Sequence, residues 1–249
     1  MSLRDSALPL LAALVIGAPA AAQADPRITG AEALVRAMHD RYSETWYSTL
    51  TFTQTTTRVL PNDSVTVEEW REWAAIPGRL RIEMGPRELG RTVIFARDST
   101  FALDQDRVVR RLDRWNDLMI VGFDVYRQPP ERTLQQLGRA GFDLTKFHVD
   151  SLDGVPVYVI GAERGDSLSK QVAIEADRLL FMRLVDPIPN QPGKTQHVWF
   201  RQYQPLGQGW IAPEVEVLVD GRRVFHETYA DIRIGQPLDE ALFDPDATP

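Results

Sequence analysis

The fold is decided by the stretch WYSTLTFTQTTTRVL, residues 46–60. Its apolar residues Leu50 and Phe52 alternate with threonines, and β-branched and aromatic residues are enriched in strands. Because successive side chains of a strand point to opposite faces, this alternation predicts a strand with one apolar and one polar face. The apolar face needs a cover, which the rest of the chain has to supply.

Runs of the same kind continue from Trp46 to Ile234, separated by tight polar turns. Pro61-Asn62-Asp63 turns the first strand, and Asp220-Gly221 is typical of a two-residue hairpin loop. Short strands divided by such turns are the pattern of an antiparallel meander. The sequence therefore predicts a mainly β protein of the α+β class, with one large antiparallel sheet of about ten or eleven strands.

Two parts of the chain have helical instead of strand spacing. Residues 28–42 predict a helix that Thr29 caps, with Glu32 three residues later as in a capping box. Residues 116–126 and 130–140 predict two short helices at mid-chain, with Pro130 at the start of the second. We call these two helices the lid, because they are placed to cover the apolar face. The apolar residues predicted for the lid are Leu118, Met119, Phe123, Leu134 and Leu137.

Residues 1–24 have the features of a cleavable signal peptide. An apolar run extends from Ala7 to Ala22, and Ala22-Gln23-Ala24 has the A-x-A form of a cleavage site. A membrane anchor is the alternative, but prolines interrupt the run and small residues dominate it. We therefore expect residues 25–249 to form a single exported domain.

The composition excludes several classes of function. The chain has no cysteine, which rules out a disulfide framework and a cysteine nucleophile. It has 35 acidic against 28 basic residues and a net charge of −7. We expect no nucleic acid as a partner, because phosphate binding needs a basic surface. The sequence contains neither a P-loop nor a G-x-G-x-x-G motif, and we expect no cofactor.

Catalytic groups form no recognisable constellation in the sequence. The histidines lack a metal-ligand spacing, and the neighbours His226 and Glu227 point to opposite faces of a predicted strand. Glu68, Glu69, Glu72 and Glu83 could supply a carboxylate pair for acid–base chemistry. Glu69 and Glu83, however, alternate with apolar or basic neighbours, as on a solvated face. We therefore expect neither a metal site nor an enzyme.

The apolar side chains of the sheet admit two interpretations, a filled core or a cavity for an acyl chain. We favour the cavity, because the sheet offers more apolar area than two short helices cover, and large exposed apolar patches mark binding surfaces. The phase of each strand assigns the following residues to the cavity: Leu50, Phe52, Leu80, Ile82, Met84, Val93, Phe95, Phe101, Leu103, Leu180, Met182, Leu184, Val215 and Val217.

The order of these elements resembles one known family. An A-x-A signal, a short amphipathic helix, the strand motif F-T-Q-T at residues 52–55, mid-chain helices and a tail containing Pro237, Leu238, Phe243 and Pro245 are similar to the periplasmic lipoprotein-carrier superfamily, the LolA/LolB-like proteins. The resemblance implies an unclosed antiparallel β-barrel lidded by helices, with a hydrophobic cavity for acyl chains. It also implies a periplasmic location, with membrane-bound donor and acceptor proteins as partners.

Three functions fit these expectations. The first is a soluble periplasmic carrier that shields the acyl chains of a lipid or lipoprotein. The second is a periplasmic protein-interaction or sensor module on the same fold, which binds a partner's peptide at an open sheet edge without transporting lipid. The third is an enzyme, which nothing in the sequence favours and which two carboxylates converging in the cavity would indicate.

Overall fold

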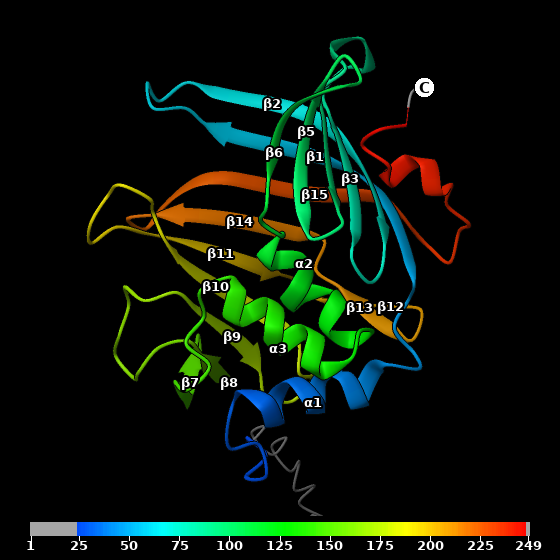
Figure 1. Cartoon of the computed structure of the whole chain (residues 1–249). Helices are drawn as coiled ribbons and strands as arrows, with labels where there is room; N and C mark the ends of the chain where they lie inside the picture. Colours follow the sequence, from blue (N-terminus) through cyan, green and yellow to red (C-terminus); the bar gives the residue numbers. More distant parts are fainter. Residues whose placement is uncertain (1–23, 248–249) are drawn as a thin grey trace, which may run out of the picture.

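The structure, a computed structural model, describes residues 24–247 and is dominated by one large sheet (Figure 1). Thirteen strands form this sheet, and the neighbouring strands run antiparallel. The strands are β1 Thr49–Val59, β2 Val65–Ala75, β3 Arg79–Met84, β4 Thr92–Ala96, β5 Ser99–Asp104, β6 Arg107–Leu112, β7 Phe147–Leu152, β8 Val155–Ile160, β9 Gln171–Glu175, β10 Phe181–Pro187, β11 Thr195–Arg201, β14 Glu214–Val219 and β15 Arg222–Ile234. The predicted signal peptide lies, apart from Ala24, outside the described residues.

The sheet curves but stays open. Its strand order is β6-β5-β4-β3-β2-β1-β15-β14-β11-β10-β9-β8-β7, so β6 and β7 are the two edges, and β1 and β15 meet in the middle. The predicted fold class, an unclosed antiparallel barrel of mainly β structure lidded by short helices, is confirmed.

The sheet contains more strands than the ten or so predicted from the sequence. The short runs between residues 79 and 112 each form a separate strand. Two longer runs break, one at Gln202 with a φ of 56° and one around Pro213. The pieces cut off by these breaks, β12 (Gln204–Leu206) and β13 (Gly209–Ile211), pair with each other in a separate two-stranded sheet.

Three α-helices lie against the concave side of the sheet (Figure 1). They are α1 Ala31–Tyr42, α2 Asp117–Gly122 and α3 Pro130–Arg139, and a 3₁₀ turn, η2 Asp124–Tyr126, joins α2 to α3 within the lid. The predicted cap of α1 is wrong, because Gly30 and not Thr29 is the N-cap and no side chain caps the helix. Residues 25–28 form a hydrogen-bonded turn of their own, which delays the start of the helix.

The main hydrophobic core lies between these helices and the sheet. Leu34 and Met38 of α1, Ile120 of α2 and Leu137 of α3 are buried in it. Each such side chain contributes roughly 1.5–3 kcal/mol by leaving water. Much of the concave side is therefore filled core, which holds the helices in place.

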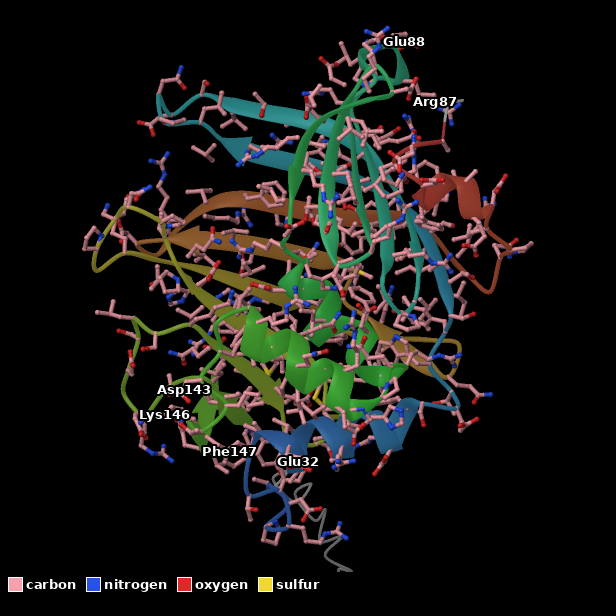
Figure 2. The ribbon with its side chains drawn as sticks, viewed as in Figure 1. Glu32, Arg87, Glu88, Asp143, Lys146 and Phe147 are labelled. Atoms are coloured by element: carbon pink, nitrogen blue, oxygen red, sulfur yellow. The ribbon has the colours of Figure 1, made fainter. Side chains whose placement is uncertain are left out.

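The C-terminal segment closes one side of the sheet. A short 3₁₀ turn, η3 Glu240–Phe243, buries Phe243, and the guanidinium of Arg79 lies 5.3 Å from the centre of its ring. At one end of the molecule lies η1 (Arg87–Leu89), while Glu32 of α1 lies at the other (Figure 2). Within residues 24–247, none of the helices has the length and apolar character needed to cross a membrane.

Candidate functional site

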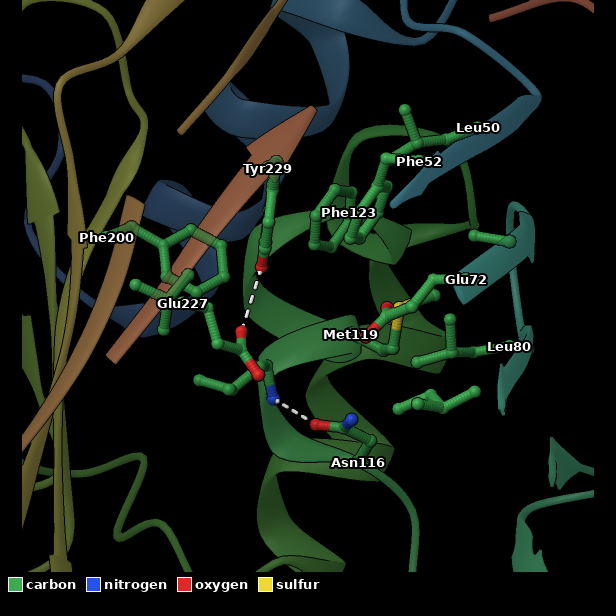
Figure 3. Close-up of a pocket in the computed structure, with 14 residues that line it drawn as sticks. Leu50, Phe52, Glu72, Leu80, Asn116, Met119, Phe123, Phe200, Glu227 and Tyr229 are labelled. Atoms are coloured by element: carbon green, nitrogen blue, oxygen red, sulfur yellow. Dashed lines mark hydrogen bonds between the residues drawn. The ribbon is translucent and has the colours of Figure 1, made fainter. Parts of the chain in front are cut away.

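A cavity of about 110 Å³ lies between the sheet and the first lid helix, α2 (Figure 3). Residues of β1, β2 and β3 form one wall, and residues of β15, β14 and β11 form the other. The two walls meet where β1 pairs with β15. The lid covers the cavity on the side that faces away from the sheet. The lining residues are Leu50, Phe52, Glu72, Ala74, Leu80, Ile82, Asn116, Leu118, Met119, Phe123, Phe200, Val215, Glu227 and Tyr229.

The structure brings together part of the residue set predicted for this site. The predicted residues that line the cavity are Leu50, Phe52, Leu80, Ile82, Val215, Leu118, Met119 and Phe123. Those that pack in the main core away from the cavity are Phe95, Leu180, Leu184, Val217, Leu134 and Leu137. Met84 and Val93 are half-buried outside the main core. A ligand-binding role for these residues stays a prediction.

Phe101 and Leu103 lie on the other face of the sheet, in a separate cluster with Ile94. From the strand phase we expected both residues to lie on the same face as Phe95. The hairpin between β4 and β5 instead pairs Phe95 with Thr100 and Ile94 with Phe101. Paired residues of antiparallel strands share a face, so the turn length reverses the phase that we carried across it.

Met182 also faces away from the cavity. It packs with Val157 and Val159 in a third cluster, whereas its neighbour Phe181 is fully buried in the main core. The pairing of β10 with β9 shifts between Phe181 and Arg183, as at a β-bulge. A bulge adds a residue to one strand and changes which face the following side chains take.

The polar part of the lining is a cluster on the two central strands and β2. Gln54 of β1 donates from Nε2 to Oε1 of Glu227 on β15, over 2.8 Å, and to Oγ1 of Thr56, over 3.0 Å. The hydroxyl of Tyr229 donates to Oε2 of Glu227 over 3.3 Å (Figure 3). Glu72 of β2 projects into the same cavity and is 8% exposed. Two carboxyl groups thus line one cavity, whose other polar side chains are Asn116 and Tyr229.

Burial controls the ionisation of both carboxyl groups. It raises the pKa of Glu227 to about 7, although the hydrogen bonds from Gln54 and Tyr229 and the charge of Arg58 act in the opposite direction. Burial also raises the pKa of Glu72 well above its usual value, and the neighbouring Glu227 raises it further. Burial thus favours the protonated form of both carboxyl groups, and Glu227 titrates near pH 7.

Sequence reasoning missed Glu227 as a cavity residue. It did predict that His226 and Glu227 point to opposite faces, and this is confirmed, since His226 contacts Glu214 with 2.8 Å between Nε2 and Oε1. Gln54 continues the phase of the predicted cavity residues of β1, which is the signal that could have extended the site. Glu227 has no such signal, because β15 pairs with β1 only in the folded sheet.

The lid is fastened to the sheet by a buried carboxyl group. Asp124, between α2 and α3, accepts a hydrogen bond from the backbone N–H of Gly78 over 2.9 Å and one from Nε1 of Trp115 over 3.3 Å. Gly78 belongs to the turn between β2 and β3. Burial raises the pKa of Asp124 to about 7, against the effect of these hydrogen bonds. Its contact joins the lid to the strands that form one cavity wall.

Two further side chains fasten the lid at the α1 side. Arg127 donates from Nη1 to the carbonyl oxygens of Ser43, over 3.1 Å, and Trp46, over 3.0 Å. The hydroxyl of Tyr126 donates to the carbonyl oxygen of Leu179 over 3.1 Å, and its ring centre lies 4.0 Å from that of Trp46. The helix α2 is also tied to the sheet, because the buried carboxyl group of its Asp117 pairs with Lys170, whose Nζ lies 3.4 Å from Oδ1 of Asp186 on β10.

Among residues 24–247, no three His, Cys, Asp or Glu side chains are grouped so as to hold a metal ion. The site contains hydrogen-bond acceptors and a long apolar wall. Its geometry suits a ligand with an apolar chain and a polar end. Two carboxyl groups in one cavity are also the feature by which we expected an enzyme to be recognised.

Comparisons with known proteins identify the fold. No protein-family model matches the chain, and no curated protein matches its sequence. A DUF1329 family protein from Desulfovibrio piger is 14% identical, with a TM-score of 0.55, over 86% of this chain and 95% of that chain. The LolA superfamily protein NE2245 from Nitrosomonas europaea is 9% identical, with a TM-score of 0.53, over 84% and 97%.

A third structure, a "putative outer membrane lipoprotein-sorting protein domain" from Vibrio parahaemolyticus, is 13% identical, with a TM-score of 0.55, over 86% of this chain and 96% of that chain. At such identities the likeness establishes the fold. The chain has a LolA-like fold, and the resemblance in fold that the sequence predicts is confirmed.

Proposed function

We propose that this protein is a periplasmic carrier that binds the acyl chains of a lipid or lipoprotein in the cavity under α2. The observation that carries the proposal is the cavity itself, whose wall is formed largely by aliphatic and aromatic side chains from both halves of the sheet. The LolA-like fold supports it, because proteins of that fold include one described as a lipoprotein-sorting domain.

The size of the cavity implies a moving lid. Pockets for small molecules typically measure about 300–1,000 Å³, whereas this one measures about 110 Å³. An acyl chain therefore enters only if α2 moves away from β1 and β3. Burial of each methylene then stabilises the complex by about 0.8 kcal/mol, which offsets the cost of separating the lid from the sheet.

Periplasmic location and membrane-bound partners belong to the same proposal. The predicted signal peptide at residues 1–24 supports export, and the LolA-like fold supports a role between membranes. A carrier of this kind receives its cargo from one membrane-bound protein and passes it to another. Its affinity for the cargo must stay modest enough to permit release.

Acid–base catalysis is the second candidate, because Glu72 and Glu227 meet in the cavity and burial raises the pKa of both. We favour binding, since two donors already engage Glu227 and most of the lining is apolar. Incubation of the protein with a bacterial lipid extract, followed by mass spectrometry, separates the two functions. Turnover that Glu72→Gln abolishes would favour the enzyme, and unchanged lipids would favour the carrier.

The interaction-module alternative has one structural feature in its favour. The edge strand β6 is exposed along its whole length, and its Val108 and Val109 are 42% and 63% exposed. A peptide could add a strand at such an edge. Arginines on the same strand are also the usual means by which edge strands avoid unwanted pairing. We therefore rank this function below the carrier.

A fluorescent fatty acid tests the proposal directly. We expect the wild-type protein to bind dansyl-undecanoic acid with saturation and a rise in fluorescence. Leu118→Trp fills the cavity from α2 and should weaken binding by roughly tenfold or more. Leu168→Trp, at a loop residue that is 53% exposed, is the matched control and should leave binding unchanged. Absence of binding to the wild type, or equal binding to both variants, would refute the carrier.

A further inference from the structure

The carboxyl group of Glu72 has no hydrogen-bonded partner within residues 24–247. The hydrogen bonds of the polar cluster run from Gln54 to Thr56, from Gln54 to Glu227 and from Tyr229 to Glu227, and none of them reaches Glu72. Glu72 is 8% exposed and lines the cavity. A buried carboxyl group without a donor is costly, so this part of the cavity favours a ligand that donates.

Arg58, whose charge acts on Glu227, does not meet this need. The guanidinium of Arg58 lies 4.6 Å from the centre of the Trp70 ring and 3.6 Å from Oε2 of Glu68. It lowers the pKa of Glu227 through its charge alone, without a hydrogen bond to either cavity carboxyl group. The charge of Arg58 is thus directed to Glu68, outside the cavity. The two interior carboxyl groups have no hydrogen-bonded cation among the described residues.

The chemistry of the cluster selects one kind of head group. An ammonium group carries three donors and a positive charge, so it can hydrogen-bond both carboxylates and balance their charge. A hydroxyl carries one donor and no charge, and an anionic head group offers neither donors nor positive charge, so it should bind more weakly. The apolar wall beside the cluster, with Phe52, Met119 and Val215, is placed to take the attached alkyl chain.

We propose that Glu72 and Glu227 form a head-group subsite that recognises the primary amine of an amphiphile whose alkyl chain lies against the apolar wall. This inference rests on the proposed carrier function and narrows its ligand class. Glu227 lies with its oxygens already oriented by Gln54 and Tyr229, while Glu72 faces it from β2 as the second acceptor. The side chains that select the amine thus lie on β2 and β15, the two strands that flank β1.

A chain-matched series of amphiphiles tests the subsite. Dodecylamine, dodecanol and dodecyl sulfate, each below its critical micelle concentration, are made to compete with the fluorescent fatty acid. We expect dodecylamine to bind roughly tenfold or more tightly than either of the others. Glu72→Gln and Glu227→Gln should each reduce this preference while dodecanol still binds. Glu69→Gln, on the exposed face of the same strand as Glu72, is the matched control.

A second measurement uses the wild-type protein alone. Burial raises the pKa of both carboxyl groups, that of Glu227 to about 7, so an amine that holds them as carboxylates should release protons near neutral pH. Calorimetric titration in two buffers of different ionisation enthalpy detects this release, which dodecanol should not cause. A preference below tenfold, no proton release, or a preference that survives both Gln substitutions would overturn the subsite and leave the carrier standing. If no member of the series binds, the carrier itself fails.

Discussion

Gln54 and Glu227 join the first and last strands of the domain, with Nε2 of Gln54 donating to Oε1 of Glu227 over 2.8 Å. The two residues are 173 positions apart in the sequence and are both buried at the polar end of the cavity. Their contact makes the β1–β15 seam, and not one continuous stretch of chain, the centre of the site.

Loss of the Gln54 amide should destabilise the fold. Gln54→Leu removes a donor from a buried carboxyl group, and we expect the free energy of unfolding to fall by about 1–3 kcal/mol at neutral pH. Denaturant titration measures the change. Thr55→Ala, at the exposed neighbour on the opposite face of β1, should change it by less than about 0.5 kcal/mol. Equal effects of the two substitutions would contradict a structural role for the Gln54–Glu227 bond.

Stability should depend on pH through Glu227. Folding raises the pKa of this carboxyl group from 4.5 to about 7, so the folded state holds a proton that the unfolded state has lost. The resulting stability is fully present below about pH 4.5 and is lost as pH rises through about 7. Glu227→Gln cannot lose a proton, so relative to the wild type it should become more stable over this window, by on the order of 3 kcal/mol.

Thermal unfolding of the two proteins at matched pH values measures this difference. The comparison with the variant is needed because Asp124, whose pKa burial also raises to about 7, acts in the same direction in both proteins. A difference between wild type and Glu227→Gln that stays constant from about pH 5 to pH 8 would show that Glu227 is not desolvated as the structure indicates.

The contact of Asp124 should control how readily the lid opens. Asp124→Ala leaves the buried N–H of Gly78 and the indole N–H of Trp115 without an acceptor. We expect a loss of about 1–3 kcal/mol in stability. Backbone amides of residues 116–126 should also exchange hydrogen faster. Asp124→Asn retains an acceptor oxygen, so its stability and its exchange rates should lie between those of the wild type and Asp124→Ala. Unchanged exchange in Asp124→Ala would exclude this contact as the lid fastening.

A smaller side chain on the lid should enlarge the cavity, lower the stability of the protein and strengthen its binding of an acyl chain. Met119 is 3% exposed and lines the cavity, so Met119→Ala should cost about 2–5 kcal/mol. The additional volume should let the protein bind the fluorescent fatty acid more tightly, because less displacement of α2 is needed. Leu60→Ala, at a residue that is 38% exposed, is the control for both measurements. Weaker binding by Met119→Ala would argue against a cavity under α2.

Local pattern was enough to predict the sheet, the lid and most of the apolar wall. The alternation at Leu50 and Phe52 identified the face of β1, and the helical spacing at Leu118 and Met119 identified the cover. Each of these inferences needs only neighbours within one element.

The positions of residues that depend on pairing between strands could not be predicted from local patterns. Phe101 and Leu103 lie on the face opposite to the one we predicted, because the two-residue connection after Ala96 sets which residues pair, and phase does not continue through a turn. Glu227 entered the site through its place beside β1, which follows from the order of strands in the sheet and not from its own neighbours in the sequence.

Photo-crosslinking with a diazirine-bearing fatty acid tests the central claim most directly. The probe is bound to the purified protein and irradiated, and the labelled residues are mapped by mass spectrometry. The carrier predicts adducts on cavity residues such as Phe52, Met119 and Val215, which excess unlabelled fatty acid suppresses. Adducts confined to the outer face of the sheet, or labelling that unlabelled fatty acid does not reduce, would contradict an acyl-binding cavity under the lid.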